Sequence, residues 1–88
     1  MRALLEIIHL ATSKFSLSSC LPRMLLSSAL ALIRHLSPVR ANREALLRQG
    51  AMQVMLPALV ASFREKGAVR CAEELLLILE QLLSDIEE

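Results

Sequence analysis

One stretch of nineteen residues, from Asn42 to Val60, constrains the fold more than any other part of the chain. It reads NREALLRQGAMQVMLPALV, and it combines a capping residue, a short amphipathic segment, a glycine and a longer apolar segment. Asn42 is of a type that accepts hydrogen bonds from the free N–H groups at a helix start. Gly50 suits the left-handed conformation that ends many helices. The stretch therefore predicts a short helix over Arg43–Gln49, a sharp turn and a second helix over Ala51–Phe63.

The composition extends this helical prediction to the whole chain. Hydrophobic residues make up 55% of the 88 residues, yet the aromatic residues are only Phe15 and Phe63, and glycines number two. Strands favour β-branched and aromatic side chains, whereas Leu and Ala favour helices. A chain of this length forms one domain. We therefore expect an all-α fold in a single domain over residues 1–88.

Apolar residues recur at helical spacing in five segments. The expected helices are Arg2–Lys14, Met24–Leu36, Arg43–Gln49, Ala51–Phe63 and Ala68–Ser84. Breaks are expected over Ser16–Pro22 and Val39–Ala41, and a polar turn over Arg64–Gly67. Pro57 should either kink its helix or mark the first turn. The acidic tail, residues 85–88, should fray.

The short–long–long order of the last three helices, opened by Asn-Arg-Glu-Ala and joined by Gly-Ala, resembles the armadillo repeat. The matching residues are Asn42, Arg43, Glu44, Ala45, Leu46, Gly50, Ala51, Met52, Leu56 and Leu59. The resemblance implies one complete repeat over 42–84 and a partial repeat over 1–37. Two long helices end at Leu36-Ser37 and Leu83-Ser84, about 47 residues apart, which is near the period of armadillo and HEAT arrays. The fold implied is an armadillo-like right-handed α-solenoid fragment of about two repeats and five helices.

The resemblance also implies candidate binding residues. Armadillo proteins that hold extended peptides do so with Trp and Asn side chains on the third helix of each repeat. His35 and Gln81 stand where Asn would be, and Arg34 lies beside His35. These three side chains are expected to hydrogen-bond to a protein partner. The alternative is that they only solvate the ends of their helices.

A second candidate surface is basic. Arg43 and Arg48, with Arg40, would form a strip across the linker and the short helix that binds an acidic group. Charge is also uneven along the chain, because residues 1–43 hold six basic residues and one acid, whereas residues 44–88 hold four basic residues and eight acids. This asymmetry fits either an acidic partner or head-to-tail contact between copies.

Catalytic, metal and nucleic-acid functions find little support in the sequence. Cys20 and Cys71 have no nearby metal-ligand partners, so both are expected to be reduced and buried. Met24, Met52 and Met55 are expected to fill the core. No nucleophile–base pair or glycine-rich phosphate loop is present, and basic runs with stacking aromatics are missing. We expect no enzyme activity, no cofactor and no nucleic-acid partner.

Together these features predict a protein–protein interaction scaffold or adaptor in the cytoplasm or nucleus, without a transmembrane segment. Because solenoids usually need at least three repeats, we expect self-association, or a chain that is a fragment or short isoform of a longer solenoid. The alternative is a small helical protein that acts at a membrane surface or mitochondrion through its amphipathic N-terminal segment.

Overall fold

The computed structural model describes residues 2–14, 17 and 19–86, and these residues form five α-helices and no strand. The helices are α1 (Arg2–Ser13), α2 (Cys20–Leu36), α3 (Arg40–Arg48), α4 (Ala51–Arg64) and α5 (Val69–Ile86), with a short 3-10 helix, η1 (Lys66–Ala68), before α5. The predicted all-α fold with five helices is thus confirmed for the described part of the chain.

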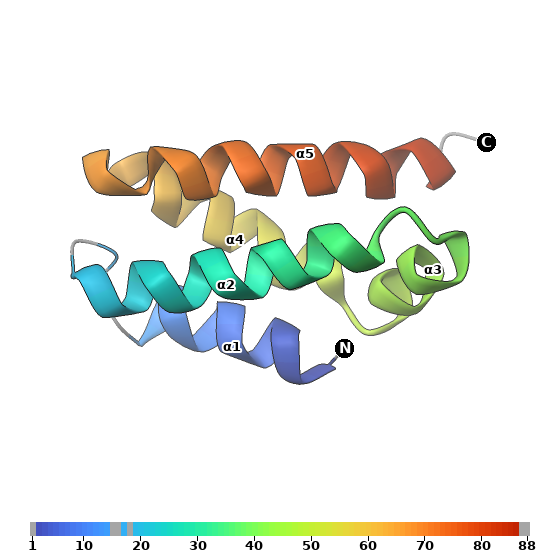
Figure 1. The fold of residues 1–88 in the computed structure, drawn as a ribbon, viewed down its shortest axis with the longest axis horizontal. Coiled ribbons are helices and arrows are strands. Elements are labelled where there is room, and N and C mark those ends of the chain that lie inside the picture. The colour runs from blue at the N-terminus through green and yellow to red at the C-terminus, as the bar shows by residue number, and fades with distance from the viewer. Residues whose placement is uncertain (1, 15–16, 18, 87–88) are drawn as a thin grey trace.

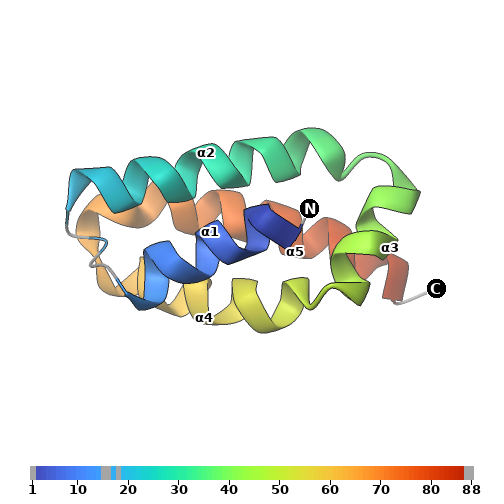
Figure 2. The same ribbon diagram turned by 90° about the horizontal axis from the view of Figure 1, so that it is seen from below.

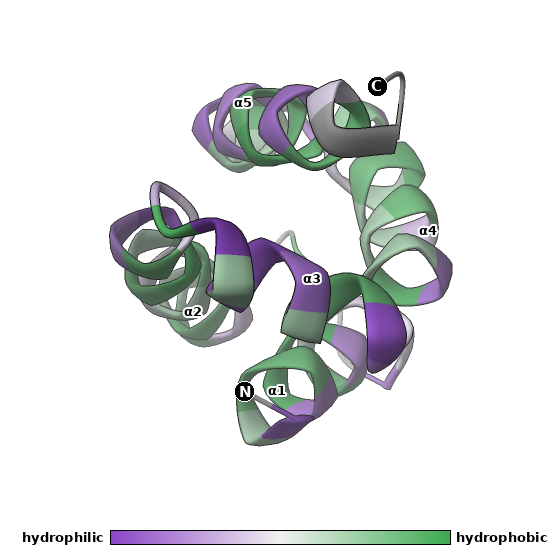
Figure 3. Ribbon diagram, turned by 90° about the vertical axis from the view of Figure 1, so that its right-hand side faces the viewer, coloured by the Kyte–Doolittle hydropathy of each residue, from purple (hydrophilic) through white to green (hydrophobic). Residues whose placement is uncertain are grey.

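Four of the helices form a closed ring, seen end-on in Figure 3. α1 packs against α2 and α4, and α5 packs against α4 and α2. The hairpin of α1 and α2 is therefore stacked on the hairpin of α4 and α5. The shorter helix α3 lies at one end of the bundle, where it joins the two hairpins (Figures 1 and 2).

All five helices contribute to one hydrophobic core. The largest fully buried apolar side chains are Ile8, Leu26, Leu30, Ile33, Leu46, Met55, Leu75, Ile78 and Leu82. Among the described residues, Ser37 and Ser62 are polar and buried. The Ser62 hydroxyl donates to the carbonyl of Ala58, one turn earlier, at 2.9 Å. Leucine and isoleucine at helical spacing thus supply the burial that aromatic residues provide in other small domains.

Helix α2 begins at Cys20, four residues earlier than the predicted Met24. Pro22 is the third residue of the helix and is compatible with it, because first-turn N–H groups have no carbonyl partner within the helix. Ser19 occupies the capping position without a side-chain hydrogen bond. The predicted break over Ser16–Pro22 was therefore too long, and its residues 16 and 18 lie outside the described part of the chain.

Asn42 does not cap α3, contrary to the prediction. The helix begins at Arg40 with Val39 in the capping position, so Asn42 lies inside the first turn. Its side-chain Nδ2 instead donates to the carbonyl of Leu36 at 3.1 Å. This carbonyl lies at the end of α2, where the helical hydrogen bonds stop, and it also accepts a longer hydrogen bond from the Val39 N–H at 3.3 Å. Asn42 therefore stabilises the end of one helix rather than the start of the next.

The junction between α3 and α4 agrees with the prediction at Gly50, which has a φ of 88°. Pro57 neither starts α4 nor lies in its first turn, because it is the seventh residue of that helix. It lies on an exposed face, together with Gln53, whose carbonyl loses its donor at this position. At the far end of the chain, Asp85 and Ile86 continue α5 beyond the predicted Ser84, and residues 87–88 are outside the described range.

Replacing Gly50 with Val should lower the free energy of unfolding by about 1–3 kcal/mol, because a β-branched side chain strongly disfavours positive φ. A Cβ at this position would lie 3.4 Å from Gln53 Oε1, so the cost comes from the backbone and not from a clash. The control is Gly50→Asn, since Asn tolerates the left-handed region better. Urea denaturation measures both, and equal losses for Asn and Val would contradict the backbone explanation.

Candidate functional site

A shallow groove runs along the seam between α2 and α5. Both helices run in the same direction (Figure 1), and hollows of about 240, 230 and 290 Å³ follow one another along the seam. We call this surface the α2–α5 groove. Its lining residues are Cys20, Arg23, Met24, Ser27, Ala31, Arg34 and His35 on α2, Gly67 on η1, and Arg70, Cys71, Glu73, Glu74 and Leu77 on α5.

An ion pair crosses the middle of the α2–α5 groove. Arg34 Nη1 lies 3.3 Å from Glu74 Oε1, and the two side chains are 49% and 30% exposed. The second carboxylate oxygen, Glu74 Oε2, is buried and has no hydrogen-bond partner among the described residues. Arg70 lines two of the hollows and makes no ion pair within the described part of the chain. The groove thus offers an ion pair with one unpaired carboxylate oxygen and, beside it, a guanidinium with capacity for an anion.

At the η1 end of the groove, Arg23 lies over Gly67. A Cβ at Gly67 would come within 1.8 Å of Arg23 Nη1, so the guanidinium occupies space that any larger residue would need. Arg23 Nε donates to the carbonyl of Ser19 at 3.3 Å, which holds the side chain along the first turn of α2. Because Gly67 has no side chain, the Arg23 guanidinium can lie close to the start of α5.

The other end of the groove is closed by a contact between α2 and α5. The buried Ser37 hydroxyl lies 2.5 Å from Gln81 Oε1 and 3.1 Å from the carbonyl of Arg34. A hydroxyl has one proton, so Ser37 donates to only one of these acceptors at a time. The Gln81 side chain is therefore hydrogen-bonded to Ser37 at the end of α2, although Gln81 as a whole is exposed at the surface.

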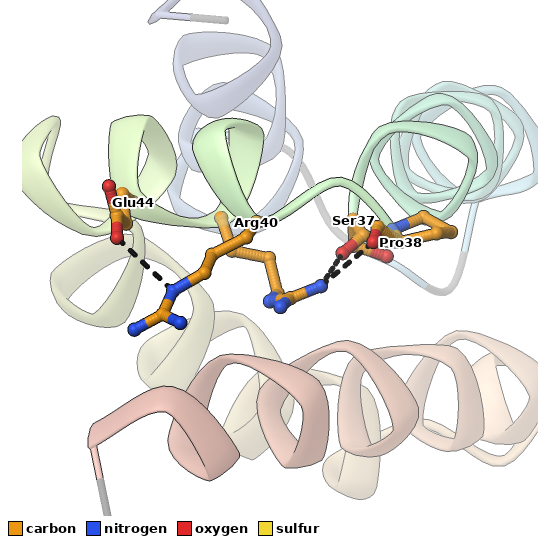
Figure 4. A network of polar contacts seen from close by, with 5 residues as sticks. Ser37, Pro38, Arg40 and Glu44 are labelled. Carbon is orange, nitrogen blue, oxygen red and sulfur yellow. Dashed lines mark hydrogen bonds and ion pairs between the residues drawn. The ribbon is translucent and has the colours of Figure 1, made fainter. Parts of the chain in front are cut away.

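Arg43 is turned back toward the α2–α3 corner. Its Nη1 donates to the carbonyl of Ser37 at 2.7 Å and to that of Pro38 at 3.0 Å. Figure 4 shows this corner, with Arg40 paired to Glu44 at 3.4 Å one turn along the same helix. The predicted basic strip is thus engaged in contacts within the chain at both of these arginines.

Arg48 lies in a different place from the other candidates. It lines an open hollow of about 620 Å³ between α1 and the α3–α4 junction, together with Arg2, Glu6 and His9 of α1. The structure therefore brings Arg34 and His35 together in the α2–α5 groove and places Gln81 beside its end. Arg43 and Arg48 belong to two other surfaces.

Sequence reasoning missed the residues that α5 contributes to the groove, chiefly Arg70 and Glu74. Their spacing of four residues was visible, but it is typical of any exposed helix face. Only the packing of α2 beside α5 shows that Glu74 faces Arg34. The contact between Arg34 and Glu74 follows from the packing of two helices that are distant in sequence, so the local sequence pattern could not predict it.

Two side chains that were predicted to be buried are exposed at the groove instead. Cys20 is exposed, and Met24 is 58% exposed. The core side of α2 is made by Pro22, Leu26, Ala29, Leu30 and Ile33. Residues 20 and 24 lie on the side of the helix that lines the groove. The prediction that they are buried was wrong because it rested on their apolar character alone and not on their position around the helix.

The groove is suited to hydrogen bonding and charge pairing. Each of its hollows is smaller than the usual range of about 300–1,000 Å³ for a small-molecule pocket. Among the described residues, no group of three or more His, Cys, Asp or Glu side chains could hold a metal ion. None of the described helices is long and apolar enough to cross a membrane.

Replacing Arg34 with Gln should lower the free energy of unfolding by about 1 kcal/mol, because it leaves the Glu74 carboxylate without its cation. This value is at the upper end of what exposed ion pairs contribute to stability. The matched control is Arg2→Gln. Arg2 lies 3.6 Å from Glu6 with both side chains well exposed, so we expect a loss below about 0.5 kcal/mol. Urea denaturation measures both losses. An equal effect would show that the groove pair is no stronger than a surface pair.

The two cysteines should differ in reactivity toward iodoacetamide. Burial raises the pKa of the Cys71 thiol, the Glu74 carboxylate raises this pKa further, and the Arg23 guanidinium acts in the opposite direction. A raised pKa means less thiolate at pH 8, and burial restricts access, so Cys71 should be alkylated more slowly than the exposed Cys20. Mass spectrometry of the labelled chain follows both sites.

Two further measurements test the cause of the slow Cys71 reaction. Labelling in urea should accelerate Cys71, and Glu74→Gln should accelerate it in the folded protein because the pKa then falls. A Cys71 that reacts as fast as Cys20 in the native state would show that this thiol is accessible.

A comparison with known protein families gives a match over the whole chain. The family model described as the E3 ubiquitin-protein ligase UBR4 TPR-like domain matches residues 1–88. No curated protein and no solved structure matches the chain significantly. The match covers the whole chain and identifies a helical-repeat domain, which agrees with the two stacked helical hairpins of the structure.

Proposed function

We propose a function from one premise: the chain belongs to the family of the E3 ubiquitin-protein ligase UBR4 TPR-like domain. Helical-repeat domains of this kind present stacked helices as surfaces for protein partners. We infer that this chain is a protein–protein interaction scaffold or adaptor, and that the α2–α5 groove is the surface that binds its partner.

The ion pair at the centre of the groove, Arg34 with Glu74, is the observation that carries this proposal. Glu74 Oε2 is buried there without a hydrogen-bond partner among the described residues. Leaving such an oxygen unpaired costs free energy and weakens the pair. A bound chain can reach the exposed parts of the pair, because the Arg34 and Glu74 side chains are 49% and 30% exposed. A backbone N–H of an extended segment is the simplest donor of the right size.

The rest of the groove indicates the chemistry of the bound segment. Arg70 lies beside the pair and can take a carboxylate from the partner. Leu77 and Met24 are about half exposed and offer apolar contact on either side. We therefore propose an extended segment that carries an acidic residue and neighbouring apolar residues. Nucleic acid is not the proposed partner, because the groove holds Glu73 and Glu74 and no aromatic side chain for stacking.

The finer assignment to an armadillo-type repeat is also a proposal. The starts of α1 and α4, Arg2 and Ala51, are 49 positions apart, and the starts of α2 and α5, Cys20 and Val69, are again 49 apart. This offset is well above the roughly 34 residues of a two-helix tetratricopeptide repeat and nearer the roughly 40–47 of armadillo and HEAT repeats. The additional helix α3 accounts for the difference and supports a right-handed, three-helix repeat over 42–84.

We further propose that the chain acts by binding in the cytoplasm or nucleus and is not itself an enzyme. A nucleophilic cysteine needs an accessible thiolate, whereas Cys71 is buried and its pKa is raised, first by that burial. The membrane-surface alternative needs the apolar side of α1 to be free. Leu5, Ile8 and Ala11 occupy that side and are buried in the core.

Proximity labelling in cells tests the groove. The groove variant Arg70→Glu/Leu77→Gln should lose the partner set of the wild type, since it reverses the charge and removes the apolar contact. A second variant at the other end, His35→Ala/Gln81→Ala, should weaken the same partners. Circular dichroism confirms folding, which we expect to persist because these side chains are all exposed.

The matched control is Arg48→Glu, which makes the same charge reversal in the hollow beside α1. It should leave the partner set unchanged. If Arg48→Glu removes the partners and the groove variants do not, the binding surface lies between α1, α3 and α4, and the proposal for the groove is wrong.

A further inference from the structure

The two ends of the helical stack expose apolar side chains on opposite sides of the molecule. In Figure 3 the α1–α2 hairpin and the α4–α5 hairpin occupy opposite sides of the ring. Each hairpin buries its inner side against the other, so its outer side faces away from the core. These outer sides are distinct from the α2–α5 groove, which follows the seam between the hairpins.

The outer side of the second hairpin, which we call the C face, carries six exposed apolar side chains: Leu56, Val60 and Phe63 on α4, and Val69, Leu76 and Leu83 on α5. On α4 they are spaced by four and three residues, and on α5 by seven, so each set forms one stripe. Gln53 and Val54 line the hollow on the α1 side of α4, and Leu77 lines the groove on the α2 side of α5. The two stripes occupy the remaining sides of these helices, where α4 and α5 adjoin.

The outer side of the first hairpin, which we call the N face, has the same character. It carries Ile7 and Leu10 on α1 and Leu21, Leu25 and Leu32 on α2. The α1 residues that turn toward α4, such as Arg2 and His9, lie on the other side of that helix. The α2 residues that turn toward α5, such as Arg34, lie away from these leucines. Leu21 is 73% exposed, the largest exposed fraction among the apolar side chains of the two faces.

The two hairpins differ in charge, and the charged side chains within the two stripes differ in sign. Helices α1 and α2 carry three basic residues and one acid, and Lys14 follows α1, whereas α4, η1 and α5 with their linker carry three basic residues and five acids. Lys14 continues the stripe of Ile7 and Leu10 on the N face. Glu73 and Glu80 fall between Val69, Leu76 and Leu83 on the C face. Apolar stripes framed by opposite charges are complementary to each other, and not each to itself.

We propose that the occupant of each face is a second copy of this chain, and that copies stack head to tail with the N face of one against the C face of the next. The chain already packs its own α1–α2 hairpin on its own α4–α5 hairpin, so the contact between copies repeats a geometry that these helices make internally. A heterologous contact of this kind leaves a free face at each end, so assembly continues past the dimer into an open filament or a closed ring.

Sedimentation of the purified wild-type chain over a range of concentrations gives the first measurement. The average mass should rise from 9.8 kDa without reaching a dimer plateau. A wild-type chain that stays at 9.8 kDa up to about 1 mM, where even contacts near −4 kcal/mol are half formed, overturns the proposal.

Two double variants, each blocking one face, give the decisive measurement. Leu25→Gln/Leu32→Gln blocks the N face, and Val60→Gln/Leu76→Gln blocks the C face. Each variant alone should be monomeric, with the dissociation constant raised about 100-fold by the loss of two apolar contacts. An equimolar mixture should form a heterodimer of about twice the chain mass, because it still contains one intact N face and one intact C face.

The outcomes separate head-to-tail stacking from other arrangements. If either blocked variant alone dimerises as strongly as the wild type, its intact face binds itself and the head-to-tail arrangement is wrong. If the mixture stays monomeric, the two faces do not bind each other. The control is Leu77→Gln, an exposed leucine on the groove side of α5, which should leave assembly unchanged. This control also separates the result from the groove, since groove binding can fail while assembly persists.

Discussion

The packing of one helical hairpin on the other is the interaction on which the rest of the structure depends. A chain of 88 residues buries a limited fraction of its surface, so its stability depends on a small number of fully buried side chains. These side chains come from both hairpins, with Ile8 and Leu26 on one side and Met55 and Leu75 on the other. Neither hairpin has a second apolar layer of its own to pack against. Each therefore requires the other, and the groove exists only because they meet.

The short helix α3 makes this packing geometrically feasible. It carries the chain from the end of α2 to the start of α4, across one end of the bundle (Figure 2). Both of its ends depend on special residues. Asn42 binds the last carbonyl of α2, and Arg43 binds the carbonyls of Ser37 and Pro38 just beyond it. Gly50 supplies the positive φ that turns the chain into α4. The polar residues of α3 therefore fix the relation between hairpins that apolar burial then stabilises.

The sequence predicted the helices well and their connections only in part. Leucine periodicity identified all five helices, and Gly50 was placed correctly because a positive φ is a local requirement. The start of α2 was wrong because Pro22 is acceptable in a first turn as well as before a helix. Asn42 was wrong because its amide binds a carbonyl six residues back, a contact set by the fold around the corner. Arg34 and His35 were placed together correctly, but the ion pair with Glu74 depends on which helices become neighbours.

Helix α5 shows why composition and exposure alone could not tell which leucines belong to the core, to the groove or to the C face. Leu75, Ile78 and Leu82 are buried in the core, whereas Leu77 is in the groove and Leu76 and Leu83 are on the C face. The leucines are chemically identical, so their roles differ only by the angle at which they leave the helix. An isolated pair of hairpins needs one apolar side on each helix, as in an ordinary amphipathic helix. A second apolar stripe on α5, matched by one on α4, costs solubility unless something covers it. In the proposed assembly a further hairpin would cover this stripe, and α5 would then be an internal element of a stack as well as a wall of the groove.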